Sequence, residues 1–323
     1  MSRTRAYRHG VLVDEDFPVE QISDYLAEPA CLVWVDVCSP DRAQLDQLGE
    51  ELALHSLALE DAAKERQRPK LDRYETHSFV TSYEARLDVG TGRVTMSEVD
   101  AFVTRQALVT VRHDEEFDIE AVVHRWDNSP DLAKLGVGYL LHGLLDYVVD
   151  SHFAAVQTLD EEIEDLEDLL FDDRPHDVEV QRRSFQLRKS LVLLRRAVLP
   201  MREVVNSLLR RDLEIVGPEL VPFYQDVYDH VLRATEWTES LRDLVSTILE
   251  TNMTIQGNRM NSIMKKVTSW AAIIAVPTAI TGFYGQNVPY PGFGQAIGFW
   301  TSALVTVVTS GALYLAFRRR DWL

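Results

Sequence analysis

The side-chain amides of Gln286 and Asn287 follow Gly285 in a segment that carries no charge. Residues 267–317 are 51 consecutive positions without Asp, Glu, Lys or Arg, in a chain that is 26% charged overall. An amide side chain offers a neutral carbonyl oxygen, which accepts hydrogen bonds from water, including the water around a cation. Mg²⁺ gives up its water reluctantly, so neutral oxygens suit an ion that keeps its water shell. The competing interpretation is a plain helix end, at which Gly and Asn adopt a backbone of positive φ.

A second group with ion chemistry is the acidic stretch TLDEEIEDLEDLLFDD, residues 158–173. Carboxylate oxygens are common ligands of Mg²⁺ and Ca²⁺. The simpler interpretation is a helix face in contact with water. The acidic residues of the stretch are Asp160, Glu161, Glu162, Glu164, Asp165, Glu167, Asp168, Asp172 and Asp173.

The uncharged segment is long enough to cross a bilayer twice. A bilayer core needs about 20 apolar residues in a helix, and residues 267–285 and 296–317 each approach that length. Between them, residues 285–295 contain the Gly and Pro residues that end helices. We therefore predict a membrane hairpin at residues 265–323. The alternative is a pair of helices buried in a soluble core.

The charged flanks predict the orientation of this hairpin. Lys265 and Lys266 precede the first span, Arg318–Arg320 follow the second, and the loop between the spans has no Lys or Arg. Positive flanks stay in the cytoplasm, so we expect both termini on the cytoplasmic side of the cell membrane. The net charge is −18 and residues 318–323 contribute +2, so residues 1–266 carry −20.

The first 134 residues predict an α/β domain. Residues 4–13, 31–38 and 107–113 read as strands, and residues 78–104 read as a β-hairpin around the turn GTGR. A helix is expected to start with Ser39 as its N-cap and Pro40 at its first position. Residues 55–70 and 116–126 each predict a further short helix.

Residues 135–264 predict long helices. Apolar residues keep 3–4 spacing from Leu140 to Leu170, and a second helix over 176–212 has a possible kink at Pro200. A third helix starts at Phe223 and meets no proline before Pro277. If it continues to Tyr284, it is roughly 90 Å long at 1.5 Å per residue and forms a stalk that enters the membrane. The fold class expected is α+β, with a stalk and two C-terminal spans.

Several segments resemble the CorA family of divalent-cation channels and transporters, over nearly the whole chain. YGQN after the first span, the terminal hairpin and the basic tail RRRDWL are similar to the family's membrane part. FYQDVYDHVLRATEWTESLRDL is similar to its stalk, and HSLALEDAAKERQRPKLDRYE to its cytoplasmic domain. The family hallmark is Gly-Met-Asn, where this chain has Gly285, Gln286 and Asn287.

The resemblance implies a funnel-shaped homopentamer in which the first span lines a pore for hydrated Mg²⁺. Asn287 matches the asparagine of the outer ion-selecting ring, and Asn261 matches one at the cytoplasmic side. Mg²⁺ bound between cytoplasmic domains is expected to hold the pore shut, because facing carboxylates repel one another until a divalent ion bridges them. Asp226 matches a position that binds this ion, with Asp88 of a neighbouring copy as its predicted partner. The acidic stretch, including Asp165, Asp168, Asp172 and Asp173, is a further candidate for ion sensing.

Helical spacing from Asn261 predicts one pore-lining face. Met264 and Val267 could form an apolar constriction that gates by dewetting. The competing interpretation is helix–helix packing through small residues. The predicted face comprises Asn261, Met264, Val267 (or Thr268), Ala271, Ala275 (or Ile274), Thr278, Gly282 and Gly285.

Other functions remain as alternatives. Because Gln286 replaces the motif methionine, the ion could be Co²⁺, Ni²⁺ or Zn²⁺, and zinc transport could be coupled to protons. A membrane-anchored ion sensor that conducts nothing is a further alternative. No phosphate loop, HExxH motif or paired nucleophile indicates an enzyme, and the acidic balance argues against nucleic acid. Cys31 and Cys38 read as reduced thiols.

Overall fold

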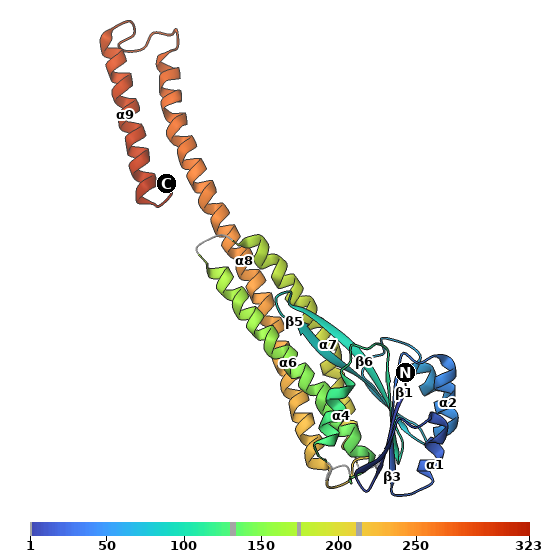
Figure 1. Cartoon of the computed structure of the whole chain (residues 1–323). Coiled ribbons are helices and arrows are strands. Elements are labelled where there is room, and N and C mark those ends of the chain that lie inside the picture. The colour runs from blue at the N-terminus through green and yellow to red at the C-terminus, as the bar shows by residue number, and fades with distance from the viewer. Residues whose placement is uncertain (1, 130–133, 173–175, 211–214) are drawn as a thin grey trace. The chain divides into compact units, whose positions relative to one another are not determined.

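The chain has two compact units, residues 1–248 and 249–323. The structure is a computed structural model that describes residues 2–129, 134–172, 176–210 and 215–323. Helix α8 (Val221–Tyr284) contributes residues to both units. Figure 1 shows the elements of each unit.

The first unit is built on a seven-stranded sheet in the order β2-β1-β3-β7-β6-β5-β4. Among the described strands, β3 and β7 form the only parallel pair. The strands are β1 (Ser2–Arg8), β2 (Val11–Glu15), β3 (Cys31–Cys38), β4 (Lys70–Arg73), β5 (Ser78–Asp88), β6 (Arg93–Val103) and β7 (Ala107–Arg112).

The hairpin of β5 and β6 confirms the prediction from sequence. Its register runs from Ser78 opposite Val103 to Asp88 opposite Arg93. The expected single strand at residues 4–13 is wrong, because it is two strands, β1 and β2. They reverse at His9 and Gly10, whose φ angles are 53° and 80°. Such left-handed backbone is easy for glycine and turns the chain within two residues.

The helix after β3 begins later than predicted. Helix α2 (Arg42–Leu52) has Asp41 as its N-cap, not Ser39. Asp41 accepts a hydrogen bond from the Gln44 amide at 2.8 Å, and the Gln44 side chain accepts one from the Asp41 amide at 3.0 Å. This reciprocal pair is a capping box. Ser39 instead has a φ of 47° and donates its hydroxyl to the His113 carbonyl at 2.8 Å.

Two hydrophobic cores lie on the two faces of the sheet because strand side chains alternate. One core joins β3 residues such as Val33 and Val35 to a layer of short helices. These are η1 (Val19–Gln21), α1 (Ile22–Leu26), α2 and α3 (Ser56–Ala62). The other core joins Trp34 and Val80 to longer helices. These are α4 (Ile119–Asp127), α6 (Val137–Phe171), α7 (Asp177–Leu208) and the first part of α8. Figure 1 shows the sheet between the two layers.

The long helices pack through aromatic and apolar side chains. Trp126 of α4 meets Trp34 edge-on at 5.0 Å between ring centroids, and its indole donates to the Leu140 carbonyl at 3.1 Å. Phe153 of α6 meets Trp237 of α8 at 5.4 Å. Helix α7 contains Pro200 in its interior. The three long helices predicted from apolar spacing are confirmed as elements.

The second unit contains the end of α8, a loop, and α9 (Ala296–Arg319). Both helices contain an apolar stretch long enough to cross a membrane, and only 6% of each stretch is buried inside the chain. These two apolar stretches are therefore not buried in a core of this chain, which was the alternative to a membrane hairpin.

Asp36 joins the parallel strands β3 and β7 through a buried ion pair. Its carboxylate accepts hydrogen bonds from Arg112 Nη2 at 2.6 Å and from Thr110 Oγ1 at 2.7 Å. We expect Asp36→Ala to lower the free energy of unfolding by about 3–5 kcal/mol, because the Arg112 charge stays buried without its partner. Urea unfolding of the full chain in detergent, followed by circular dichroism, measures this.

The matched control is Asp46→Ala. Asp46 pairs with Arg42 at 2.9 Å, but the two side chains are 51% and 58% exposed. Water screens this pair, so the loss is expected to stay under about 1 kcal/mol. Equal losses in the two variants would contradict the role given to the buried pair.

Candidate ion-conduction site

The amides of Gln286 and Asn287 stand directly after the last residue of α8. The Gly285 amide still donates to the Thr281 carbonyl at 2.9 Å, and the Gln286 amide donates to the Phe283 carbonyl at 3.3 Å. Neither Gly285 nor Asn287 has positive φ. The competing interpretation of a helix end made by left-handed Gly and Asn is therefore wrong. Gln286 and Asn287 are exposed, so their oxygens are open to solvent in a single chain.

The loop after these amides is held by two close approaches. The Tyr290 hydroxyl donates to the Tyr284 carbonyl at 3.0 Å, which satisfies one of the free carbonyls at the end of α8. At the start of α9, a Cβ on Gly298 would lie 2.5 Å from the Gly292 carbonyl oxygen. Gly292 itself has a φ of 92°. The chain therefore needs glycine at both Gly292 and Gly298 where it turns back into α9.

The predicted pore-lining residues lie on the side of α8 that the rest of the unit leaves uncovered. In the membrane-spanning part of α8, half-buried or buried residues recur with helical spacing, and a matching series runs along α9. These two series indicate where the helices pack together. On α8 the series is Ser269, Ile273, Val276, Ile280 and Tyr284, and on α9 it is Ser302, Thr306, Thr309, Leu313 and Phe317.

All of the predicted pore residues fall outside that packed face. Met264 and Val267 are 58% and 61% exposed. The remaining members of the face are exposed as well: Asn261, Ala271, Ala275, Thr278, Gly282 and Gly285. Within one chain, this face therefore does not pack against α9.

The N-terminal end of the face opens into a cavity of about 600 Å³. Asn261 and Met264 line it together with Trp322 from the C-terminal tail. Trp322 stacks on Phe317 with 5.7 Å between ring centroids. The structure therefore brings the tail beside two of the predicted pore residues, which sequence spacing did not reveal.

Asp226, the predicted regulatory residue, is available to an ion. Its side chain is 67% exposed, and His230 Nδ1 lies 3.9 Å from its carboxylate. Burial lowers the pKa of the nearby His142, although the charges of Asp146 and Asp226 oppose that shift. Because a neutral His142 carries no positive charge, it does not offset the negative charge of Asp226.

Asp88, its predicted partner, is the last residue of β5 and accepts a hydrogen bond from Thr91 Oγ1 at 2.8 Å. Among the described residues of one chain, no contact joins Asp88 to Asp226. A shared ion would need a second copy of the chain, which the resemblance also requires.

The acidic stretch lies on the outer face of α6. Asp165 and Asp168 are exposed, while the apolar residues between them and their neighbours are buried. Asp172 follows the end of α6 and lies 2.9 Å from His176. Asp173 lies outside the described residues. Asp165 also lines a cavity of about 760 Å³ beside the turn between β5 and β6.

One group that sequence spacing missed has metal-ligand chemistry. Ligand atoms of Glu98, Asp100 and His113 all lie within 4.8 Å of one another. Burial raises the pKa of Asp100, and the Asp100 carboxylate raises that of His113, whose Nε2 lies 3.4 Å away. Thr81 donates to Asp100 at 2.6 Å. The i, i+2 spacing of the two acids on β6 is the signal that could have identified the cluster. The carboxylate of Glu98 accepts hydrogen bonds from the amides of Arg66 and Gln67, so these groups already have partners within the protein.

Comparison with known proteins decides the family. A family profile described as "CorA-like Mg2+ transporter protein" matches residues 30–319. The chain belongs to the CorA family. The cobalt/magnesium transport protein CorA of Thermotoga maritima is 31% identical over 294 residues, covering 90% of this chain and 83% of that protein. The zinc transport protein ZntB of Yersinia pestis is 24% identical over 300 residues, covering 92% and 89%.

Solved structures confirm the CorA-like fold. The complete structure of the CorA magnesium transporter from Methanocaldococcus jannaschii aligns with a TM-score of 0.79 and 24% identity, over 99% of this chain and 98% of that chain. The full-length CmaX structure aligns with a TM-score of 0.71 and 19% identity, over 98% and 96%. The α/β domain, the long helical stalk and the C-terminal helix are thereby confirmed.

Membership of the CorA family establishes the general activity of the protein. This CorA-family chain is a transporter of divalent metal ions and not an enzyme, as expected. It is a membrane protein whose two candidate spans lie at the C-terminal end.

The close approach at Gly298 gives a test of the loop that carries the amides. We expect Gly298→Ala to lower divalent-ion flux in proteoliposomes at equal protein content. The added methyl group would collide with the Gly292 carbonyl and displace the loop, at a cost of about 1–3 kcal/mol.

Gly311→Ala is the control in the same helix, because a Cβ there meets nothing within 4 Å. It should leave flux close to that of the unchanged protein. If both alanine variants conduct equally well, the loop geometry does not position the site.

Proposed function

We propose that this CorA-family protein assembles into a homopentamer whose α8 helices line a path for hydrated Mg²⁺. The observation that carries the proposal is the uncharged, exposed face of α8 that runs from Asn261 to Gly285 and ends beside Asn287. An apolar face left open by its own unit must meet lipid or other copies. Its small and hydroxyl residues suit a narrow path better than a lipid contact.

The polar groups along this face are few and neutral. Thr278 donates its hydroxyl to the Ile274 carbonyl at 3.0 Å, which satisfies its hydrogen and leaves oxygen lone pairs free. Polar residues in a membrane-spanning helix commonly face a water-filled path. At the outer end, one Asn287 oxygen from each copy would accept hydrogen bonds from the water shell of the ion.

This arrangement favours an ion that stays hydrated. Mg²⁺ holds its water strongly, and residues 267–317 contain no carboxylate that could replace that water. Two relatives at 31% and 27% identity carry cobalt/magnesium transport in their names. We therefore propose Mg²⁺ as the principal ion, with Co²⁺ and Ni²⁺ as further substrates.

Zinc transport coupled to protons is the second candidate. It is favoured by Gln286 in place of the motif methionine and by the 24% identity to a zinc transport protein. Proton coupling within the membrane would need a group that titrates there. Residues 267–317 contain no Asp, Glu, His, Lys or Arg, so passive flux driven by membrane potential is the better-supported mechanism. A membrane potential that is negative inside the cell would drive this cation flux inward.

Asn287→Ala tests the ion-selecting role. In proteoliposomes with a membrane potential, we expect Mg²⁺ flux through the variant to fall to the background level, because the outer amide ring is removed. Ion-sensitive dyes for Mg²⁺, Co²⁺, Ni²⁺ and Zn²⁺ measure the flux in turn, with and without a pH gradient.

Gln295→Ala removes an exposed amide from the other end of the same loop and is the control. It should conduct normally. Flux of Zn²⁺ alone, and only with a pH gradient, would establish the second candidate instead. No flux of any ion through the unchanged protein would indicate a sensor that conducts nothing.

We further propose that cytoplasmic Mg²⁺ closes the path by binding between copies. The exposed carboxylate of Asp226 would share the ion with Asp88 of a neighbouring copy, and the acidic face of α6 would raise the local cation concentration. Facing carboxylates repel one another when the ion leaves, so the closed state would lose its support as Mg²⁺ falls.

Asp226→Lys tests this regulation. We expect flux to persist at internal Mg²⁺ concentrations that shut the unchanged protein, because a lysine ammonium cannot bind the ion. Flux into vesicles loaded with increasing Mg²⁺ gives the inhibition curve.

Asp229→Lys makes the same charge change at a neighbouring exposed position of α8. Its inhibition curve should match that of the unchanged protein. An unaltered curve in the Asp226 variant would rule out an ion sensor at that position.

A further inference from the structure

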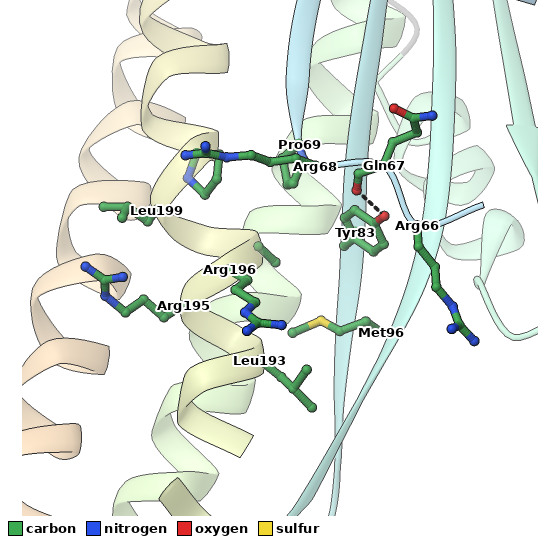
Figure 2. A pocket seen from close by; sticks show the side chains of 12 residues that line it. Arg66, Gln67, Arg68, Pro69, Tyr83, Met96, Leu193, Arg195, Arg196 and Leu199 are labelled. Carbon is green, nitrogen blue, oxygen red and sulfur yellow. Dashed lines mark hydrogen bonds between the residues drawn. The ribbon is translucent and has the colours of Figure 1, made fainter. Parts of the chain in front are cut away.

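A basic pocket lies in the first unit. It has a volume of about 630 Å³, within the usual range for small-molecule sites. It is formed by the loop before β4, by β5 and β6, and by the middle of α7 (Figure 2). The described residues that line it are Arg66, Gln67, Arg68, Pro69, Tyr83, Met96, Leu193, Arg195, Arg196, Ala197, Leu199 and Pro200.

The charge of this pocket is opposite to that of the protein. Acidic residues outnumber basic ones by 51 to 33 along the chain, yet the described lining holds four arginines and no acid. Within the described residues, Arg195 alone among the four forms an ion pair, with Glu239 at 3.2 Å. The other three, Arg66, Arg68 and Arg196, are exposed and form no ion pair among the described residues. Water and salt screen these exposed charges in the free protein, and an anion would neutralise them.

The remaining walls of the pocket are apolar. Tyr83 and Met96 come from the sheet, and Leu193 and Leu199 from α7. Figure 2 shows Arg196 reaching from α7 toward Met96, and Arg68 reaching from the loop toward α7. Guanidinium groups beside an apolar wall suit a ligand with both phosphates and a ring, since Arg binds phosphate bidentately and stacks on flat groups.

The loop at the rim is fixed in a strained conformation before any ligand arrives. Arg66 has a φ of 68°, which is uncommon for a residue with a side chain. The buried carboxylate of Glu98 accepts hydrogen bonds from the amides of Arg66 at 2.5 Å and Gln67 at 3.1 Å. The Tyr83 hydroxyl donates to the Gln67 carbonyl. A strained backbone conformation persists where the surrounding contacts fix it, and such residues are common at binding sites.

We propose that this pocket binds a nucleoside triphosphate, with the phosphates on Arg68 and Arg196 and the base against Tyr83 and Met96. Arg68 and Arg196 reach into the pocket and form no ion pair among the described residues, which suits a ligand with several negative charges. The base of the nucleotide would contact the apolar wall. Inorganic polyphosphate has no ring and would leave that part of the pocket empty. Glu98 is a positioning residue here, because it holds the loop that carries Arg66 and Arg68. The site does not depend on ion conduction.

The experiment is equilibrium binding to the full chain in detergent, in EDTA. The chelator removes divalent ions, so that a metal–nucleotide complex cannot bind through the acidic sites. Calorimetry compares ATP, GTP, tripolyphosphate and adenosine. We expect saturable binding of ATP and GTP, weaker binding of tripolyphosphate, and weaker binding of adenosine.

Three variants and a control locate the site. Arg68→Ala and Arg196→Ala should each weaken ATP binding by roughly ten- to a hundredfold, as expected for a lost hydrogen bond to a charged group. Met96→Trp fills the pocket without changing its charge and should abolish binding. Arg202→Ala removes an exposed arginine from the same helix, outside the pocket, and should bind ATP normally.

Thermal unfolding checks that every variant is folded. No saturable binding of ATP to the unchanged protein would overturn the proposal. An equal loss in the Arg202 variant would overturn it too, because it would reflect general attraction of anions. Tripolyphosphate binding as tightly as ATP would overturn the assignment to a nucleotide.

Discussion

The lack of charge along residues 267–317 is the constraint on which the second unit depends. A helix in lipid satisfies its backbone hydrogen bonds internally, so an uncharged helix can leave water without an unpaired polar group. The surroundings that suit helix α8 therefore change along its length. Its charged residues, which suit water, end at Lys266, and its apolar residues, which suit lipid, begin at Val267. Because the apolar stretches of both helices are almost unburied within one chain, their surroundings must come from lipid or from other copies.

This constraint also explains the geometry of the loop between the spans. The loop has no charges with which to order itself, so it relies on backbone contact. Tyr290 caps the end of α8, and Gly292 and Gly298 touch through their backbones at the start of α9. The amides of Gln286 and Asn287 stand between these fixed points. In the proposed assembly their oxygens would be held at one level by the ends of the helices and not by side-chain ion pairs.

The first unit follows a different rule, because it folds in water and contains many charges. Its buried charges are paired or hydrogen-bonded, as Asp36 is with Arg112 and Asp100 is with Thr81 and His113. Unpaired acids lie on outer faces, where water solvates them. The four arginines around Met96 stand out in sign, because they line one pocket without an acid in an acidic protein. Three of them are exposed and form no ion pair among the described residues, which favours a binding site over a structural network.

The sequence by itself determined the elements and the membrane part. Two strand-like runs around the turn GTGR predicted β5 and β6. The 3–4 spacing of apolar residues predicted the first long helix, the absence of proline predicted the third, and the uncharged run predicted the two spans, because each is a local pattern in the sequence. The resemblance carried by YGQN and the stalk segment placed the chain in the CorA family, and the matched profile confirms it. The exposure of the predicted pore face agrees with a helical repeat counted from Asn261.

Only the tertiary structure decided features that depend on contacts distant in sequence. Asp41 replaced Ser39 as the cap because the Ser39 hydroxyl reaches His113 on the next strand. The cluster of Glu98, Asp100 and His113 and the arginine pocket required knowing which strands and helices are neighbours. Trp322 lines one cavity with Asn261, some 60 residues away in the chain. Periodicity records which way a side chain faces on its own element, whereas the partner it meets is set by how the elements pack.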